Sequence, residues 1–384
     1  VAAFVISACE LPDWFGSTEK PPLSGKRISV LALETDILPD PGLENLKVEL
    51  PRPYLNTSWP QAGGFPDHAM HHLAAGENLR MIWEAEIGEG SSDEGRILTT
   101  PVIADGRIFT VDALSAISAF DAATGEPLWG IDPRLENDEQ DGFGGGLAYA
   151  YGRLFATTGF GHVVALDPID GTVYWRRDIG IPIRAAPVVV GARVFVITYD
   201  NQLWTLSSKD GEVLWTNAGI VEIAGLLGAA VPAVDNDIVI VPYSSGELFA
   251  LRVENGRTVW SDSLGAERPG IGSLATLNDI NGSPVIDRGI VYAIGHGGRL
   301  LAIELRSGNR VWEQDLAGLN TPWVAGQYLF IVTVYGDVVC LASRTGKVRW
   351  VKSLPRYKDS IGRANRNYTI IIFLNCLQSF SMRQ

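Results

Sequence analysis

The stretch Ala119-Phe120-Asp121-Ala122-Ala123-Thr124-Gly125-Glu126-Pro127-Leu128-Trp129 carries the pattern that decides the fold, a glycine followed four residues later by a tryptophan. The same pair recurs at Gly171/Trp175, Gly211/Trp215, Gly256/Trp260, Gly308/Trp312 and Gly346/Trp350. Counting Trp83, which lacks the glycine, these tryptophans stand about 44 residues apart, and a repeat of ~40–45 residues made of short strands is the period of a propeller blade. The sequence therefore predicts an all-β fold, a β-propeller of four-stranded antiparallel blades.

The first repeat divides into four short strands. Residues 101–103, 107–111 and 116–120 supply the first three, and Trp129 lies on the fourth. The third and fourth strands meet at Thr124-Gly125, where glycine supplies the positive φ of a tight hairpin turn. Five further repeats carry the same turn, so we expect about six complete blades.

The repeated tryptophans are expected to dock neighbouring blades. Each ring would lie between two blades, where its area dominates packing and its N–H reaches a backbone carbonyl. These docking residues are Trp129, Trp175, Trp215, Trp260, Trp312 and Trp350. The alternative, an aromatic cage or a quinone-stacking platform, needs one such ring, whereas a fold repeats it in every blade.

Composition limits the possible functions. Hydrophobic residues make up 46% of the chain and charged residues 20%, which is typical of a folded protein. The net charge of −13 repels a phosphate backbone, so we expect no nucleic acid partner. The three cysteines are too few and scattered for a disulfide framework or a four-ligand zinc site. Cys340 is expected to be a small buried strand residue.

The start of the chain resembles a lipoprotein signal. Residues 1–8 are apolar and end in small side chains directly before Cys9, which would then be acylated. We expect residues 1–8 to be the remnant of a signal peptide, and residues 9–76 to be an acylated N-terminus and proline-rich tether. The alternative is a short apolar tail with an incidental cysteine.

The pattern A-[FLI]-D-x-x-[TD]-G-x-x-x-W, as in residues 119–129 and 165–175, resembles the tryptophan-docking repeat of pyrroloquinoline-quinone-type propellers. Two families share it, the quinoprotein alcohol and glucose dehydrogenases and the BamB family of outer-membrane β-barrel assembly lipoproteins. With the Cys9 motif and the proline-rich tether, the chain resembles the BamB family over residues 9 to about 357. That resemblance implies an eight-bladed, non-enzymatic scaffold.

The resemblance also implies where a partner binds. Residues 277–285 are similar to the segment that enters a blade in this family and that, with a neighbouring interblade loop, contacts the central barrel-forming protein of the assembly machinery. We expect the partner-binding residues to be Leu277, Asp279, Asn281 and Glu222. Asn281 stands where a second carboxylate is usual, and the loop at residues 217–226 lacks the arginine expected there.

The function implied is that of a scaffold lipoprotein, anchored at the periplasmic face of the outer membrane of a Gram-negative bacterium. It would assist the insertion of barrel proteins and receive unfolded outer-membrane proteins on exposed strand edges. The alternative is a quinoprotein dehydrogenase-like periplasmic enzyme, which would need carboxylates for calcium, a catalytic aspartate and often adjacent cysteines. No two cysteines are adjacent, and we expect no catalytic residue, cofactor or metal.

Two other motifs are interpreted as structural. Clustered imidazoles at His68, His71 and His72 could bind a transition metal, but they lie in the tether without a cysteine, so we expect a solvated loop. The glycine-rich residues 141–146 lack the Lys-Ser/Thr of a phosphate loop and are expected to form an interblade loop.

The end of the chain departs from the repeat. The propeller is expected over residues 77–357, and residues 358–384 carry no glycine–tryptophan pair, so we expect an atypical tail produced by truncation or a frameshift. Trp83 has no inner strands before it, and its blade would need strands from the C-terminus. A smaller closed ring is the alternative, since propellers have 4–8 blades.

Overall fold

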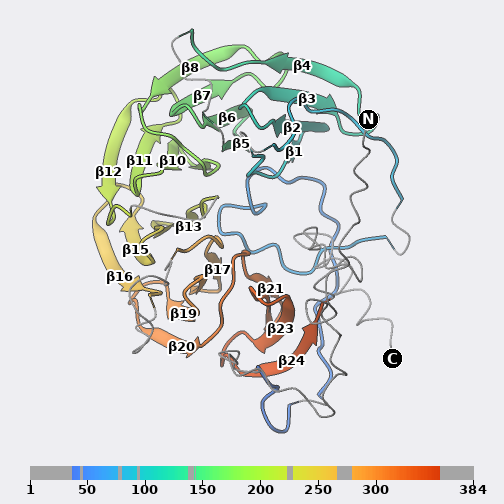
Figure 1. The fold of residues 1–384 in the computed structure, drawn as a ribbon, viewed down its shortest axis with the longest axis vertical. Helices are drawn as coiled ribbons and strands as arrows, with labels where there is room; N and C mark the ends of the chain where they lie inside the picture. Colours follow the sequence, from blue (N-terminus) through green and yellow to red (C-terminus); the bar gives the residue numbers. More distant parts are fainter. Residues whose placement is uncertain are drawn as a thin grey trace, which may run out of the picture. The chain divides into compact units, whose positions relative to one another are not determined.

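A computed structural model describes residues 37–43, 46–76, 80–92, 96–136, 142, 144–222, 228–265 and 279–354. Within these residues the chain forms six four-stranded sheets and no helix. Each sheet pairs its strands antiparallel in sequence order. Figure 1 shows the sheets following one another, with the first strand of each sheet toward the middle and the last strand outermost. The all-β propeller predicted from the repeat is confirmed.

The first blade consists of β1 (Val102–Ala104), β2 (Arg107–Val111), β3 (Ile117–Asp121) and β4 (Pro127–Ile131). The second and third blades consist of β5 (Gly145–Ala150), β6 (Arg153–Thr158), β7 (His162–Leu166), β8 (Val173–Asp178), β9 (Val188–Val190), β10 (Arg193–Ile197), β11 (Gln202–Ser207) and β12 (Val213–Ala218). The fourth and fifth consist of β13 (Ala233–Asp235), β14 (Ile238–Pro242), β15 (Glu247–Arg252), β16 (Thr258–Ser263), β17 (Val285–Asp287), β18 (Ile290–Ile294), β19 (Leu300–Glu304) and β20 (Arg310–Gln314). The sixth consists of β21 (Trp323–Ala325), β22 (Tyr328–Val332), β23 (Asp337–Ala342) and β24 (Val348–Ser353).

The expectation of an interblade loop over residues 141–146 is wrong at its end, because Gly145 and Gly146 begin strand β5. A Cβ on Gly146 would lie 2.5 Å from the Cβ of Ala186, which precedes the next inner strand. Glycine therefore lets two inner strands approach closely, so Gly146 serves this strand contact and not a loop.

A glycine turn and a bulge set the position of each tryptophan. Gly125 has a φ of +76°, which glycine adopts without steric cost, so β4 turns back tightly on β3. Ala119 pairs with Trp129 but the next residue pairs with Pro127, which leaves Leu128 as a β-bulge. The other five blades shift register at the same place. The bulge thus re-aims the side chain that follows it.

Each tryptophan lies against the glycine turn of the following blade. A Cβ on Gly171 would lie 2.9 Å from the ring of Trp129, so only glycine leaves room for the indole. The ring nitrogens donate to carbonyl oxygens across the interface: Trp83 to Ala122 (3.2 Å), Trp129 to Pro168 (3.1 Å), Trp175 to Ser208 (3.2 Å), Trp215 to Val253 (3.2 Å), Trp260 to Leu305 (2.8 Å) and Trp312 to Ser343 (2.8 Å). Trp350 of the last blade packs on the same apolar cluster as Val48 and Leu50.

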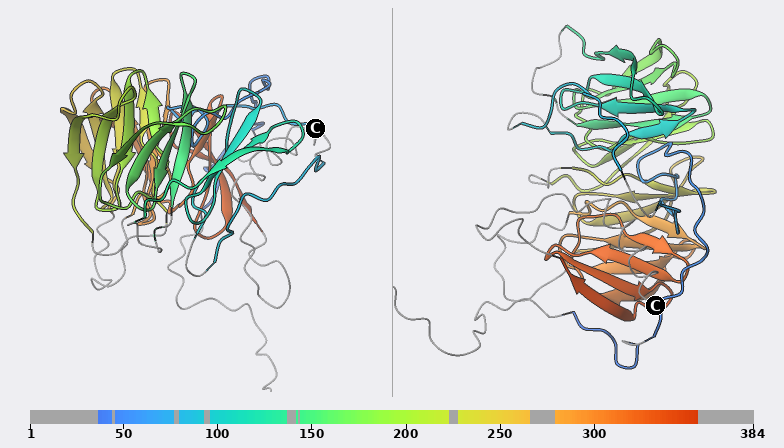
Figure 2. Two further views of the ribbon diagram at one scale, coloured as in Figure 1. Left: turned by 90° about the horizontal axis from the view of Figure 1, so that it is seen from above. Right: turned by 90° about the vertical axis from the view of Figure 1, so that its right-hand side faces the viewer.

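The turns gather on two faces. Since every blade has four antiparallel strands, the turns from first to second and from third to fourth strand share one side, the turn face. The hairpins from second to third strand, such as residues 198–201, and the connections between blades, such as residues 179–187, share the opposite side, the connection face. The left view of Figure 2 shows the strands running side by side between the two faces.

Residues 59–73, which we call the strap, run along the inner edges of the blades and appear within the blue segment of Figure 1. Trp59 exchanges two backbone hydrogen bonds with Ile103 of β1, of 2.7 and 2.9 Å. Strap carbonyls accept further backbone N–H groups: Tyr149 of β5 to Pro60 (2.6 Å), Val234 of β13 to Pro66 (2.7 Å) and Ile286 of β17 to Asp67 (2.8 Å). The strap also bonds β9 through Gln61 and β21 through His71, so it contacts the innermost strand of every blade.

The compact unit that contains the blades begins at Leu38, not at residue 77. The expected tether over residues 9–76 is therefore corrected for the part from residue 38 onward, where Asp40 bonds Val348 and the strap bonds the inner strands. The physical reason is that edge strands present unpaired backbone groups, which an extended segment can satisfy. Residues 1–36 lie outside the described part of the chain. In the part described, nothing helical is long and apolar enough to cross a bilayer.

Candidate functional site

The connection face carries three of the four residues expected to bind a partner. Glu222 follows β12 and is exposed, whereas Asp279 precedes β17 and is only 5% exposed. Asn281, two residues further on, is half-buried. Leu277 lies outside the described residues, as do Cys9 and residues 355–384.

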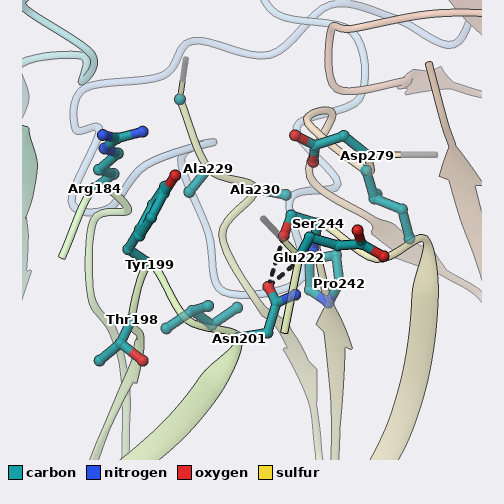
Figure 3. A pocket seen from close by; sticks show the side chains of 13 residues that line it. Arg184, Thr198, Tyr199, Asn201, Glu222, Ala229, Ala230, Pro242, Ser244 and Asp279 are labelled. Atoms are coloured by element: carbon teal, nitrogen blue, oxygen red, sulfur yellow. Dashed lines mark hydrogen bonds between the residues drawn. The ribbon is translucent and has the colours of Figure 1, made fainter. Parts of the chain in front are cut away.

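Glu222 and Asp279 line one small pocket, together with Arg184, Tyr199 and Asn201 (Figure 3). The side chains come from connections between blades and from the hairpin that joins β10 to β11. The pocket has a volume of about 30 Å³, which is room for about one water molecule. It is too small for a substrate, so its polar groups shape the surface.

Asn201 ties the loop that carries Glu222 to two blades. Its amide oxygen accepts from the Ser244 backbone N–H and hydroxyl, both at 3.0 Å, and its amide nitrogen donates to the Ile220 carbonyl at 2.6 Å. The Ile220 N–H donates to the Glu247 carboxylate at 2.7 Å. Asn201 has a φ of +61° and is 2% exposed. These bonds fix the backbone of Ile220, two residues before the exposed Glu222.

The pocket carries charges of both signs. The guanidinium of Arg184 lies over the Tyr199 ring at 4.3 Å from its centroid, a cation–π contact. Figure 3 shows Arg184 and Asp279 on opposite sides of the pocket. Exposed apolar side chains stand beside it, with Ile220 60% and Val221 64% exposed. An apolar centre with polar groups at its rim is typical of a surface that binds protein.

A larger cavity of about 410 Å³ opens at the centre of the blades. Its floor includes Trp59 and His68 of the strap, and its wall includes Asn281 and the residues that precede the inner strands. Among the described residues of the lining there is no carboxylate. The quinone-bound calcium of a quinoprotein dehydrogenase needs carboxylate ligands, so this lining does not fit that cofactor.

The expectation of a solvated histidine loop is wrong for His68, which is 3% exposed. Its Nδ1 lies 2.7 Å from the Pro284 carbonyl oxygen, which can only accept, so Nδ1 carries the proton. Burial lowers the pKa of His68 to about 4. His71 and His72 are half-buried, and no group of three or more metal-ligating side chains occurs among the residues that the structure describes.

Sequence reasoning missed Asn201 and the strap. Asn201 follows Asp200 at a hairpin, and Asp-Asn is a turn signal that could have pointed to a left-handed residue there. The strap carries no repeated pattern. The expectation for Cys340 is confirmed, because it lies in β23 with no exposed area.

A family model described as outer membrane protein assembly factor BamB matches residues 113–352. The assembly factor BamB of Yersinia pestis is 27% identical over 277 residues, which cover 71% of this chain and 70% of that protein. An uncharacterized protein of Rickettsia prowazekii is also 27% identical, over 73% of this chain and 68% of its own. The crystal structure of BamB from Moraxella catarrhalis has a similar fold, with a TM-score of 0.55 at 21% identity over 67% of this chain and 74% of that one.

Proposed function

This chain belongs to the family of the outer membrane protein assembly factor BamB, and from that membership we propose that it is a non-enzymatic scaffold. It would assist the folding and insertion of β-barrel proteins into the outer membrane. The observation that carries the proposal is the convergence of Glu222 and Asp279, from two different connections between blades, on one small pocket of the connection face.

The partners follow from the same resemblance. The connection face would bind the central barrel-forming protein of the assembly machinery, and the scaffold would also bind unfolded outer-membrane proteins. Cys9 would carry acyl chains that anchor the protein at the periplasmic face of the outer membrane, where stable binding needs more than one chain.

The two carboxylates have different roles in this proposal. Glu222 is exposed and can contact a partner directly. Asp279 is 5% exposed, so its carboxylate offers a partner little contact area, and its backbone carbonyl oxygen accepts from the His296 N–H at 3.0 Å, which ties this connection to the β18–β19 hairpin. A partner surface with basic and apolar side chains complements the exposed Glu222 beside Ile220 and Val221.

Affinity capture of the central barrel-forming protein by the purified chain tests the proposal. Glu222→Lys reverses a charge at the centre of the surface and is expected to weaken capture about tenfold, since each 1.4 kcal/mol of lost binding is a factor of ten. Glu254→Lys is the matched control, because Glu254 is also exposed but lies in the β15–β16 turn on the turn face. Absence of capture by the unsubstituted chain, or equal loss in both variants, contradicts the proposed surface.

A further inference from the structure

We propose that the strap is a built-in peptide ligand, and that the inner edges of the six blades form a seat which binds this segment without needing its covalent connection to the rest of the chain. Residues 59–73 then belong to the six blades as a bound peptide belongs to its receptor. The occupant of the seat is this chain's own segment.

The seat is built from one repeated backbone position. Ile103, Tyr149, Val234 and Ile286 hold equivalent places on β1, β5, β13 and β17, and each bonds a backbone group of the strap. In an antiparallel sheet, alternate residues of an edge strand point their N–H and C=O groups away from the sheet. The strap accepts the N–H at this level in each of these blades, and at Ile103 it also donates to the C=O, as an added strand does in peptide recognition.

The third blade uses a side chain for the same purpose. The amide nitrogen of Gln61 donates to the Val189 carbonyl at 2.9 Å, and the Val189 N–H donates to the Gln61 amide oxygen at 3.0 Å. Gln61 is 4% exposed, so the pair forms out of water, where an unmade hydrogen bond is costly. A side-chain amide here replaces a strand backbone and ties the seat to one residue of the strap.

Prolines remove the competing donors. The next backbone position on the same edge, two residues earlier, is a proline in five of the six blades: Pro101, Pro187, Pro232, Pro284 and Pro322. Proline has no N–H to offer to another strand. In these five blades the inner edge therefore offers an outward N–H at the level where the strap lies and none two residues earlier, which favours binding at that level.

The strap has its own fitted shape. Met70 is 1% exposed, and a Cβ on Gly64 would lie 2.1 Å from its sulfur. The flanks are different, since residues 51–55 and residues 74 and 76 are exposed. A fitted middle between accessible flanks is what allows the segment to be cut free while it stays bound.

The test uses the full chain with protease sites inserted after Pro53 and after Gly76. We expect the fragment of residues 54–76 to co-elute with the six blades after both cuts. A labelled synthetic peptide of residues 54–76 should exchange into the cut protein, whereas a scrambled peptide should not. The proposal is overturned if the fragment separates from the folded blades, if the blades unfold on cutting, or if the scrambled peptide binds equally well.

Two variants sharpen the result. Gln61→Ala is expected to speed release of the cut fragment at least about tenfold, because it removes two buried hydrogen bonds. Gln327→Ala is the control, since Gln327 is exposed in the β21–β22 turn. Equal release rates for both variants would show that Gln61 does not hold the strap, and would count against the seat.

Discussion

The indole of Trp59 stacks on the indole of Trp323, with ring centroids 6.5 Å apart and planes inclined by 20°. Trp59 also pairs through its backbone with Ile103 in the first blade, and Trp323 donates its ring N–H to the His71 carbonyl at 2.9 Å. The first and sixth blades are thus joined through the strap, although Trp59 and Trp323 are far apart in the sequence.

Replacing Trp59 with alanine is expected to destabilise the fold by about 2 kcal/mol. This is less than the roughly 3–5 kcal/mol typical of a fully buried tryptophan, because the Trp59 indole is half-buried. Urea unfolding followed by circular dichroism measures the change. Trp59→Phe keeps an aromatic partner for Trp323 and should lose clearly less. A Trp59→Ala variant as stable as the unsubstituted chain would mean that the stacked pair does not join the blades.

Substituting the glycines of the Gly–Trp pairs should destabilise the fold for two separable reasons. Gly256 and Gly152 both have a φ of +72°. A Cβ on Gly256 would lie 2.5 Å from the Trp215 ring, whereas one on Gly152 would meet nothing within 4 Å. Gly152→Ala should therefore cost about 1 kcal/mol from backbone strain alone, and Gly256→Ala about 2–4 kcal/mol once overpacking is added.

Thermal and urea unfolding of both glycine variants give this comparison directly. The difference between them isolates the tryptophan contact, because the backbone strain is shared. Equal destabilisation would mean that the ring of Trp215 moves aside at no cost, and docking would then not depend on glycine.

The blades were predictable from the sequence because their signal repeats. Every blade has a left-handed residue before its fourth strand and an indole within that strand, so Gly125 and Trp129 recur at a fixed offset. The strap was not predictable, because its bonds use backbone groups, which any sequence supplies. Its side-chain contacts, such as Gln61 with Val189 and His68 with the Pro284 carbonyl, join residues far apart in the chain, which no local pattern indicates.

The candidate surface was predictable only in part. Glu222 and Asp279 came from a family resemblance, and the exposure of each came from packing that no local pattern encodes. Asp279 has the same charge as Glu222 in the sequence, yet it is 5% exposed. The neighbouring connections between blades determine which carboxylate can contact a partner, and these connections come together only in the folded protein.

Cys340 should be chemically inert in the folded chain. Burial raises the pKa of its thiol to about 12, and alkylation requires the thiolate. At pH 8 we expect iodoacetamide to modify Cys340 about a thousandfold more slowly in the folded than in the urea-unfolded protein. Peptide mass mapping separates Cys340 from Cys9 and Cys376. Similar rates in both states would mean that β23 opens readily.

His68 should make stability depend on pH. Its pKa is about 4 in the fold and about 6.5 in an unfolded chain, so the unfolded state binds more protons between these values. Stability therefore falls as pH decreases from about 6.5 to about 4, by roughly 3 kcal/mol at 1.36 kcal/mol per pKa unit. Burial raises the pKa of the adjacent Asp67, which acts in the opposite direction.

His68→Asn separates the two groups, because asparagine can donate to the Pro284 carbonyl, tolerates the φ of +60° and does not titrate. We expect the free energy of unfolding of the unsubstituted chain to fall by roughly 3 kcal/mol more than that of His68→Asn between pH 7 and pH 4. Urea titrations at four pH values measure it. Parallel pH profiles for the two proteins would show that His68 accepts its proton in the folded strap without penalty.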